Sequence, residues 1–366
     1  MPPPYHSTDH DGHLSPERDY TENPLIVTWE VTRACALACR HCRANADPDR
    51  HPDELTTAEG KALIDRVAAF GPPPPILVFS GGDPLERADL FELLTYATTN
   101  GLLTAVTPAP TSALTKVVLN RCKDAGVHRI ALSLDGETAA RHDAFRAVPG
   151  SFDTIQRAAE YAQDIGLSIQ INTTVTARTV NDLPGIADLV EAVDAVMWEV
   201  FFLVPIGRGR DLEQVSPSAA EQTLRWLYRC QRDVDFRLIT VEAPQYRRVA
   251  SQIERMEGRG DPEVGSTGDG KGFVFVSHVG AVYPSGFLPI SVGNVRDDDL
   301  LDLYRESGLF QQLRTPDRFH GFCGRCPYNA RCGGSRARAH ATSGDPLAND
   351  PLCVFTSLNE SPARNA

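Results

Sequence analysis

Residues 26–46, IVTWEVTRACALACRHCRANA, decide the fold, because an apolar run leads directly into three closely spaced cysteines. Apolar and β-branched residues alternate in residues 25–31, which predicts a β-strand. Cys35, Cys39 and Cys42 then lie in the loop that leaves the carboxyl end of this strand, where α/β enzymes hold their reactive groups. Thiolates at this spacing can converge on one iron–sulfur cluster, and three ligands leave one of its four irons open to a second molecule.

Beyond this stretch, short apolar runs alternate with helical patterns up to about residue 205. This alternation predicts an α/β fold with a parallel sheet and right-handed crossovers. The expected strands are residues 25–31, 76–79, 103–107, 129–133, 167–175 and 197–204, and the expected helices are residues 57–70, 87–99, 111–125, 150–165 and 181–193.

Composition excludes several classes of protein. The chain of 366 residues has 36 basic and 48 acidic residues and no Lys/Arg-rich tract, which argues against nucleic-acid binding. No apolar run is long enough for a membrane span, and the polar N-terminus does not resemble a signal peptide, so we expect a soluble, cytoplasmic protein. Seven of the nine cysteines form two groups with metal-ligand spacing, which favours iron–sulfur sites over disulfides.

Two further motifs follow predicted strands. Residues 80–84, SGGDP, come after the second strand, and paired glycines there let a ligand approach the backbone closely, although an ordinary strand-to-helix turn has the same composition. Residues 133–136, SLDG, follow the fourth strand, and Arg146 lies ten residues beyond them. On the fifth strand Asn172 and Thr174 share one face by the two-residue period.

These motifs together resemble the radical S-adenosylmethionine (SAM) superfamily. In that family SAM chelates the open iron of a [4Fe–4S] cluster through its amino and carboxylate groups, and the reduced cluster cleaves it to a 5′-deoxyadenosyl radical. The resemblance implies an open (β/α)6 partial barrel, similar to part of a TIM barrel.

The resemblance also implies the contacts to SAM. The first cluster would be held by Cys35, Cys39 and Cys42. The family's GGEP motif binds the amino group, with Asp83 here in place of Glu, and an Arg pairs with the carboxylate through two parallel hydrogen bonds. Residues matching the family's SAM contacts are Gly81, Gly82 and Asp83 for the amino group, Ser133 and Arg146 for the carboxylate side, and Leu203 and His41 for adenine. If its face of the fifth strand lines the barrel interior, Asn172 is expected to contact ribose or substrate.

A second group of thiols lies near the end of the chain. Residues 272–295 alternate like a β-hairpin with its turn at residues 279–280, and Cys323, Cys326, Cys332 and Cys353 follow. By spacing alone these four could bind zinc or a four-iron cluster. The group resembles the SPASM domain, and the resemblance implies a small α+β region of the SPASM/twitch-like type. It also implies one auxiliary [4Fe–4S] cluster on these four cysteines.

Departures from the SPASM pattern are informative. Ser285 and Arg336 stand where the family has two cysteines of a first auxiliary cluster, so we predict that this cluster is absent. Gly286 stands where sulfatase-maturing relatives have a catalytic Asp, so that activity is not expected. The predicted division is a tail or clasp at residues 1–23, a partial barrel at 24–212, a helical linker with a mobile loop at 213–272 and a SPASM-like region at 273–366.

The resemblance is greatest to SPASM-type enzymes of haem d1 and alternative haem synthesis. It implies hydrogen abstraction from a small carboxylate-bearing metabolite, with decarboxylation or oxidation, on a substrate of tetrapyrrole or sugar-nucleoside type. A maturase of a ribosomal peptide is the alternative, and a non-catalytic iron–sulfur electron carrier is a weaker one. The expected partners are a small-molecule substrate and an electron donor such as flavodoxin or ferredoxin, without nucleic acid or membrane.

Overall fold

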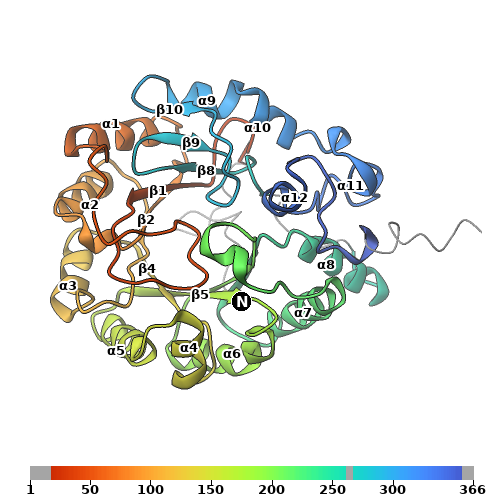
Figure 1. The fold of residues 1–366 in the computed structure, drawn as a ribbon, viewed down its shortest axis with the longest axis horizontal. Coiled ribbons are helices and arrows are strands. Elements are labelled where there is room, and N and C mark those ends of the chain that lie inside the picture. Colours follow the sequence, from red (N-terminus) through yellow and green to blue (C-terminus); the bar gives the residue numbers. More distant parts are fainter. Residues whose placement is uncertain (1–17, 261–266, 357–366) are drawn as a thin grey trace, which may run out of the picture.

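The computed structural model describes residues 18–260 and 267–356 (Figure 1). Most of the predicted tail, part of the predicted mobile loop and the last ten residues lie outside the described residues. No helix in the described part is long and apolar enough to cross a membrane.

One sheet of ten strands organises the molecule, in the order β10-β9-β8-β1-β2-β3-β4-β5-β6-β7. Every strand from β8 through β1 to β7 runs parallel to its neighbour, and only β9 and β10 are antiparallel. The strands are β1 (Ile26–Thr32), β2 (Ile76–Gly81), β3 (Thr104–Val106), β4 (Arg129–Ser133), β5 (Ser168–Val175), β6 (Met197–Phe202), β7 (Arg237–Val241), β8 (Phe273–Val276), β9 (Ala281–Tyr283) and β10 (Gly293–Asn294).

Helices form a ring outside the curved sheet (Figure 1). The five predicted crossover helices are present as α1, α2, α3, α5 and α6. The helices are α1 (Thr57–Ala68), α2 (Leu90–Thr99), α3 (Lys116–Asp124), α4 (Ala139–Arg146), α5 (Ser151–Asp164), α6 (Leu183–Ala192), α7 (Pro217–Cys230), α8 (Gln245–Met256), α9 (Leu300–Glu306), α10 (Gly308–Leu313), α11 (Gly321–Arg325) and α12 (Arg336–Ser343).

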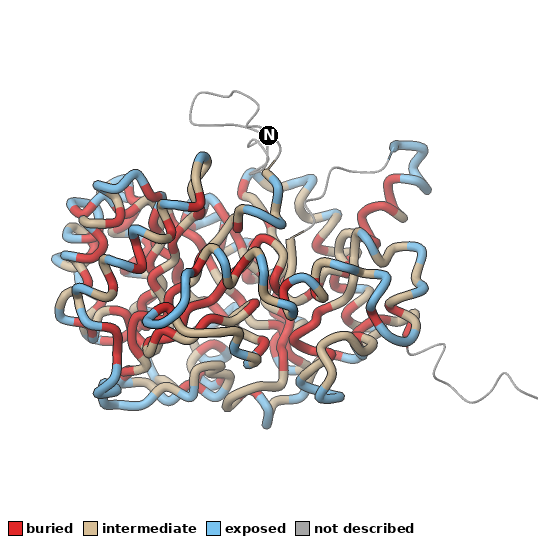
Figure 2. The backbone as a smooth tube through the Cα atoms, turned by 90° about the horizontal axis from the view of Figure 1, so that it is seen from above, coloured by how far each residue is buried: buried red, intermediate tan, exposed pale blue. Residues whose placement is uncertain are grey.

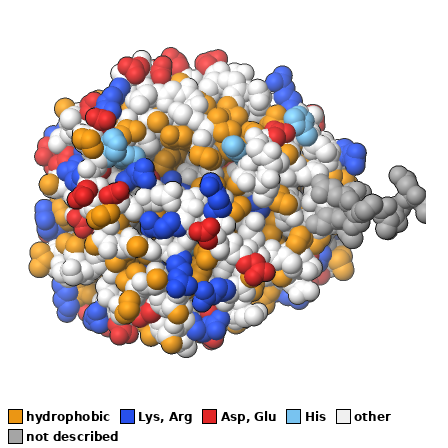
Figure 3. All heavy atoms as spheres, viewed as in Figure 1, with side chains coloured by type: hydrophobic (Ala, Val, Ile, Leu, Met, Phe, Trp, Pro, Cys, Tyr) orange, Lys and Arg blue, Asp and Glu red, His pale blue; other side chains and the backbone are white. Residues whose placement is uncertain are grey.

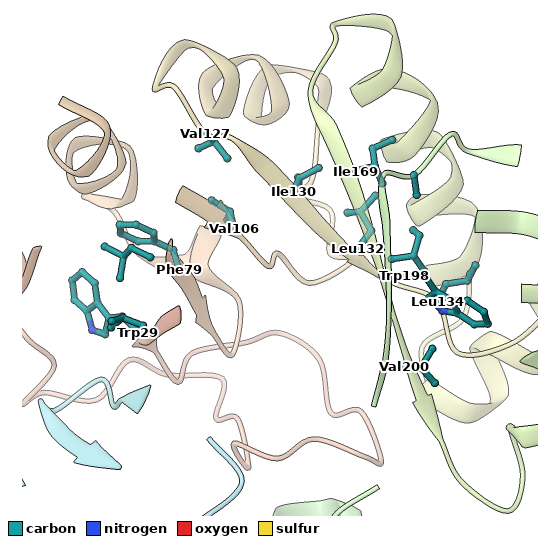
Figure 4. Close-up of a cluster of buried hydrophobic side chains, with 14 of the residues drawn as sticks. Trp29, Phe79, Val106, Val127, Ile130, Leu132, Leu134, Ile169, Trp198 and Val200 are labelled. Carbon is teal, nitrogen blue, oxygen red and sulfur yellow. The ribbon is translucent and has the colours of Figure 1, made fainter. Parts of the chain in front are cut away.

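The two-residue period of the strands separates a core from a cavity. On β1, Val27 and Trp29 are fully buried among the outer helices, whereas Thr28 faces the inside of the curved sheet and lines a cavity. Trp29 packs against Phe79 of β2 with ring centroids 5.7 Å apart, and side chains of the same kind continue through β3 to β6 (Figure 4). Each large side chain buried this way contributes about 1.5–3 kcal/mol.

Three elements differ from the sequence-based expectation. The stretch 213–272, predicted as helices and a loop, also contains β7, which extends the parallel sheet beyond β6. Helix α4 was not predicted. The helix expected from residue 111 begins only at Lys116, because Thr115 caps it by accepting a hydrogen bond from Val118 N–H. Thr111 instead donates to Asp83 Oδ2 at 2.9 Å.

Within the described residues the sheet does not close into a barrel, since β7 and β10 are its two edges. The C-terminal helix α12 is bonded to the β7 side of this opening through Arg338, which is fully buried. The Arg338 guanidinium donates to the carbonyl oxygens of Phe202 at 3.1 Å and Glu242 at 2.8 Å and pairs with Asp350 at 3.3 Å. In Figure 2 buried segments run through the middle of the molecule and exposed turns surround them.

Candidate active site

A cavity of about 650 Å³ lies on the concave face of the sheet. Alternate residues of several strands line it, which places it inside the partial barrel. The predicted site residues that line it are Cys35, Cys39, His41, Cys42, Gly81, Gly82, Ser133, Arg146, Asn172 and Leu203, together with Cys332 from the second group of thiols.

The cysteine loop is held by backbone and side-chain hydrogen bonds. Cys35 N–H donates to Asp47 O at 2.8 Å, and Arg208 Nε donates to Cys39 O at 2.8 Å. Cys35 and Cys39 are only 7% and 8% exposed. Burial raises the pKa of the Cys35 thiol to about 11, and a bound metal would favour the thiolate.

The glycine loop packs directly on the cysteine loop. Gly82 N–H donates to Thr32 O at 2.9 Å, and a Cβ atom at Gly82 would lie 2.3 Å from Ala34 O. Gly81 has a φ of 156°, outside the usual range of other residues. These two positions therefore require glycine, and their backbone borders the cavity.

Asp83 supports this loop from behind. Its carboxylate is fully buried and accepts hydrogen bonds from Leu85 N–H at 3.1 Å, Ala109 N–H at 3.3 Å and Thr111 Oγ1 at 2.9 Å. Asp83 does not line the cavity, unlike the glycines before it. In this arrangement its carboxylate positions the backbone of the loop.

Arg146 ends α4 beside the cysteine loop. Its Nη1 donates to Asp135 Oδ2 at 2.7 Å, and its Nη2 lies 3.8 Å from Cys39 Sγ. Although burial alone would raise it, the charges of His41 and Arg146 hold the pKa of Asp135 below its usual value. His41 stacks on Phe145 with ring centroids 4.8 Å apart, and its Nε2 is 3.8 Å from Asp135.

Strands β4, β5 and β6 supply the remaining predicted residues. Ser133 and Asn172 are direct neighbours across β4 and β5, and both line the cavity. The backbone of Leu203 is already bonded, because its N–H donates to Val175 O and its carbonyl accepts from Arg338 Nε. Leu203 therefore offers its side chain to the cavity.

Three features of the first site fit a [4Fe–4S] cluster with SAM. Three thiols on one loop face one cavity, and two glycines leave the backbone beside them open. The buried Nε of Arg146 has no hydrogen-bond partner among residues 18–260 and 267–356, as expected of a donor that awaits an anion. Within the same residues no group of three Cys, His, Asp or Glu side chains is suited to a single metal ion.

Two thiols of the second group are buried, and the other two, Cys326 and Cys332, are half-buried. Cys323 and Cys353 are 7% and 9% exposed. Burial raises the pKa of Cys332 to about 12, while a backbone hydrogen bond from Gly334 opposes this. Arg336 Nη2 lies 3.8 Å from Cys323 Sγ, so the residue that replaces a family cysteine contacts a thiol of this group. Hydrogen bonds to sulfur, such as the one from the Gly334 backbone to Cys332, are found around iron–sulfur clusters.

Sequence reasoning missed three carboxyl groups in the cavity wall, those of Glu199, Glu242 and Asp269. Glu242 follows β7 with a φ of 56°, an uncommon conformation for a residue other than glycine. Burial, followed by the charge of Asp269, raises its pKa well above the usual value, and Ser335 Oγ donates to its side chain. Asp269 in turn accepts from the N–H groups of Arg336 and Ala337 at the start of α12. The only sequence signal was the short run of β7 before Glu242.

Comparisons with known proteins agree with this geometry. The model of the Radical SAM superfamily matches residues 29–190. The AdoMet-dependent heme synthase of Nitratidesulfovibrio vulgaris is 41% identical over 93% of this chain and 94% of its own length. The mycofactocin maturase MftC of Mycobacterium tuberculosis is 31% identical over 90% of this chain and 83% of its own.

Among solved structures, Streptococcus suis SuiB bound to S-adenosylmethionine has the same fold, with a TM-score of 0.71 and 16% identity over 91% of this chain and 78% of that one. The cysteine loop, the glycine loop and the parallel sheet of this chain are thus those of a known enzyme family, whose members bind a [4Fe–4S] cluster and SAM. The chain is an enzyme of the radical SAM superfamily.

Proposed function

We propose that this enzyme makes haem by oxidative decarboxylation of propionate side chains on an iron tetrapyrrole. The observation that carries the proposal is the charge of the cavity wall, where basic side chains outnumber acidic ones ten to three. The chain as a whole has a formal net charge of −12. Several Lys and Arg side chains lie in the middle of the face shown in Figure 3. Positive charge concentrated in one cavity of an acidic protein favours a substrate with several carboxylates.

Two further observations support a tetrapyrrole. The cavity volume of about 650 Å³ is in the range of sites for molecules of this size, and Phe201, Phe275 and Phe287 in its wall suit a flat macrocycle. The relative with 41% identity is named a heme synthase.

The proposed cofactors are a [4Fe–4S] cluster with SAM on Cys35, Cys39 and Cys42, and one auxiliary [4Fe–4S] cluster on Cys323, Cys326, Cys332 and Cys353. When bound, the first cluster and SAM supply a 5′-deoxyadenosyl radical. Conversion of one propionate to vinyl releases CO₂, gives one hydrogen atom to the adenosyl group and leaves one electron for an acceptor. A reducing partner such as flavodoxin or ferredoxin and a cytoplasmic location belong to the same proposal.

The residues of the chain hold and orient the reactants. Gly81 and Gly82 leave room for SAM against the backbone, and Arg146 offers its unbonded Nε to the SAM carboxylate. Asp135 fixes the guanidinium in this position at 2.7 Å. The low exposure of Cys35 and Cys39 keeps water from the place where a radical forms.

The test is conversion of iron coproporphyrin III by the anaerobically reconstituted enzyme with SAM and dithionite. We expect 5′-deoxyadenosine, CO₂ and haem. Cys35→Ala abolishes all three products, whereas Cys230→Ala on α7, outside both thiol groups, retains them. SAM cleavage without any haem under these conditions would contradict the proposal.

A peptide substrate is the second candidate, favoured by the 31% identity to mycofactocin maturase. The basic cavity wall weighs against it, because a peptide backbone carries no repeated negative charge. A sugar nucleoside carries fewer carboxylates than a tetrapyrrole and fits the wall less well. An electron carrier has no use for a cavity that joins the thiols to a glycine loop.

A further inference from the structure

Three cations of the cavity wall are not held in a direct ion pair with a carboxylate of the described residues. Arg247, Lys271 and Arg314 all line the cavity, and none of them forms an ion pair with any residue of 18–260 or 267–356. Other cations of the same wall are paired, for example Arg43 with Glu30 at 3.0 Å. The three therefore differ from the cations that the fold holds in a direct ion pair.

The hydrogen-bond partners of Arg247 and Arg314 are uncharged oxygens, whereas Asp19 attracts Lys271 and Arg314 from beyond ion-pair distance. Arg314 donates to the carbonyl oxygens of Gly270 at 2.8 Å and Tyr304 at 2.7 Å. Arg247 donates to the carbonyl oxygens of Arg331 and Thr267. Carbonyl groups orient a guanidinium without cancelling its charge.

Of the three cations, Lys271 has the fewest polar contacts. Its ammonium makes no hydrogen bond to any described residue, and the side chain is half-buried. Burial lowers its pKa, the charges of Arg247 and Arg314 lower it further, and the charge of Asp19 opposes this shift without cancelling it. A partly buried cation beside two others costs free energy that an anion between them would recover.

The position of Lys271 along the sheet separates it from the thiols. Ile26, the first residue of β1, pairs with Phe273 at the start of β8, so Lys271 lies before the amino end of this strand pair. Cys35 lies beyond the carboxyl end of β1, which is 7 residues long. At the rise of a strand, roughly 20 Å separate the two backbones along this direction.

We propose that Lys271, flanked by Arg247 and Arg314, binds a carboxylate of the substrate that does not react. This rests on the proposed function, in which one edge of a tetrapyrrole reacts near the thiols and the opposite edge keeps its propionates. A cation group at the far end of the cavity holds that opposite edge, and so decides which propionates face SAM. Lys271 is thus a specificity-determining residue that touches no reacting atom.

The experiment measures binding without turnover. Mesoporphyrin IX carries only the two propionates that haem retains, and its dimethyl ester carries no charge. The reconstituted full-length enzyme with SAM is titrated with each porphyrin in the same detergent buffer, and Kd is read from the absorption band. The variants are Lys271→Gln, Lys271→Arg and, as a control, Lys61→Gln on the outer surface of α1, where Lys61 pairs with Glu92.

Lys271→Gln is expected to raise the Kd of mesoporphyrin IX at least tenfold and to leave that of the ester unchanged. Lys271→Arg restores binding, and Lys61→Gln has no effect. Equal losses for acid and ester, or no loss for the acid, would overturn the inference while the proposed function stands. Failure of the unaltered enzyme to bind either mesoporphyrin IX or coproporphyrin III would overturn both.

Discussion

Gly82 lies where the glycine loop meets the backbone of the cysteine loop. A Cβ atom there would lie 2.3 Å from Ala34 O and 2.5 Å from Arg33 O, and neither backbone atom can turn aside as a side chain does. Gly82→Ala is therefore expected to lower the free energy of unfolding by about 1–3 kcal/mol. It also displaces the loop that borders the SAM site, so SAM binding weakens. Urea unfolding and calorimetric titration with SAM measure the two effects.

Gly308→Ala is the matched control, because no atom lies within 4 Å of a Cβ built at this position at the start of α10. It should leave both quantities unchanged. Equal behaviour of the two variants would show that the contact between the loops is not tight.

His142 makes stability depend on pH. It is fully buried, its Nδ1 accepts from Asp135 N–H at 3.0 Å, and burial lowers its pKa to about 4. In the unfolded chain the pKa is about 6.5, so between these values the unfolded state binds a proton that the folded state does not. The contribution of neutral His142 to the free energy of unfolding is therefore fully present above pH 6.5. It falls by about 3 kcal/mol as the pH drops towards 4.

Urea midpoints at pH 7 and pH 5 measure this effect. His142→Asn keeps an acceptor for Asp135 N–H and removes the titration, so its midpoint depends less on pH than that of the unaltered chain. Equal pH dependence of the two would assign the loss to other groups.

At the scale of residues, the sequence identified side chains that belong to a local motif. Cys35, Gly82 and Arg146 border one cavity as expected. The partners of these residues could not be predicted, because they depend on packing between distant segments. Asp83 bonds to Thr111 behind its loop, and Arg146 pairs with Asp135.

At the scale of elements, the segment from α11 to the end of α12 predicts how many iron atoms the chain binds. Arg336 begins α12 and its guanidinium lies against Cys323, where a further cysteine would be needed for another cluster. The reconstituted chain is therefore expected to hold about eight irons, two clusters of four. Cys326→Ser lowers this to about four and retains SAM cleavage. Iron and sulfide analysis measures the count, and a value near twelve would contradict it.

The same scale shows why some elements were predicted and others were not. The crossover helices repeat a clear period, and α1 is bounded by a capping box of Thr56 and Glu59. Strand β7 is short and lies between two helices, so its apolar residues offered no distinct signal. The parallel pairing of β8 with β1 joins Phe273 to Ile26, and no local pattern encodes so distant a contact.

At the scale of the whole molecule, the predicted barrel and the predicted SPASM-like region are joined by direct contacts. Strand β8 lies in the C-terminal segment but pairs with β1, and Arg43 of the cysteine loop donates to Gly286 O at 3.0 Å. The two regions thus share one sheet and one cavity wall. We propose that they unfold together, as contacts of this kind couple neighbouring units.

The edges of the described sheet at β7 and β10 affect the width of the interior. A closed barrel has a fixed circumference, because every strand is tied to two neighbours by its ladder of hydrogen bonds. Here the perimeter is interrupted, and Arg338 of α12 bonds to the backbone on the β7 side of the opening. On this side the width of the interior is therefore set by how the C-terminal segment packs, not by a ladder of backbone hydrogen bonds. In an open sheet of this kind, side-chain packing in the C-terminal segment, and not the number of strands, determines how wide a reactant the interior admits.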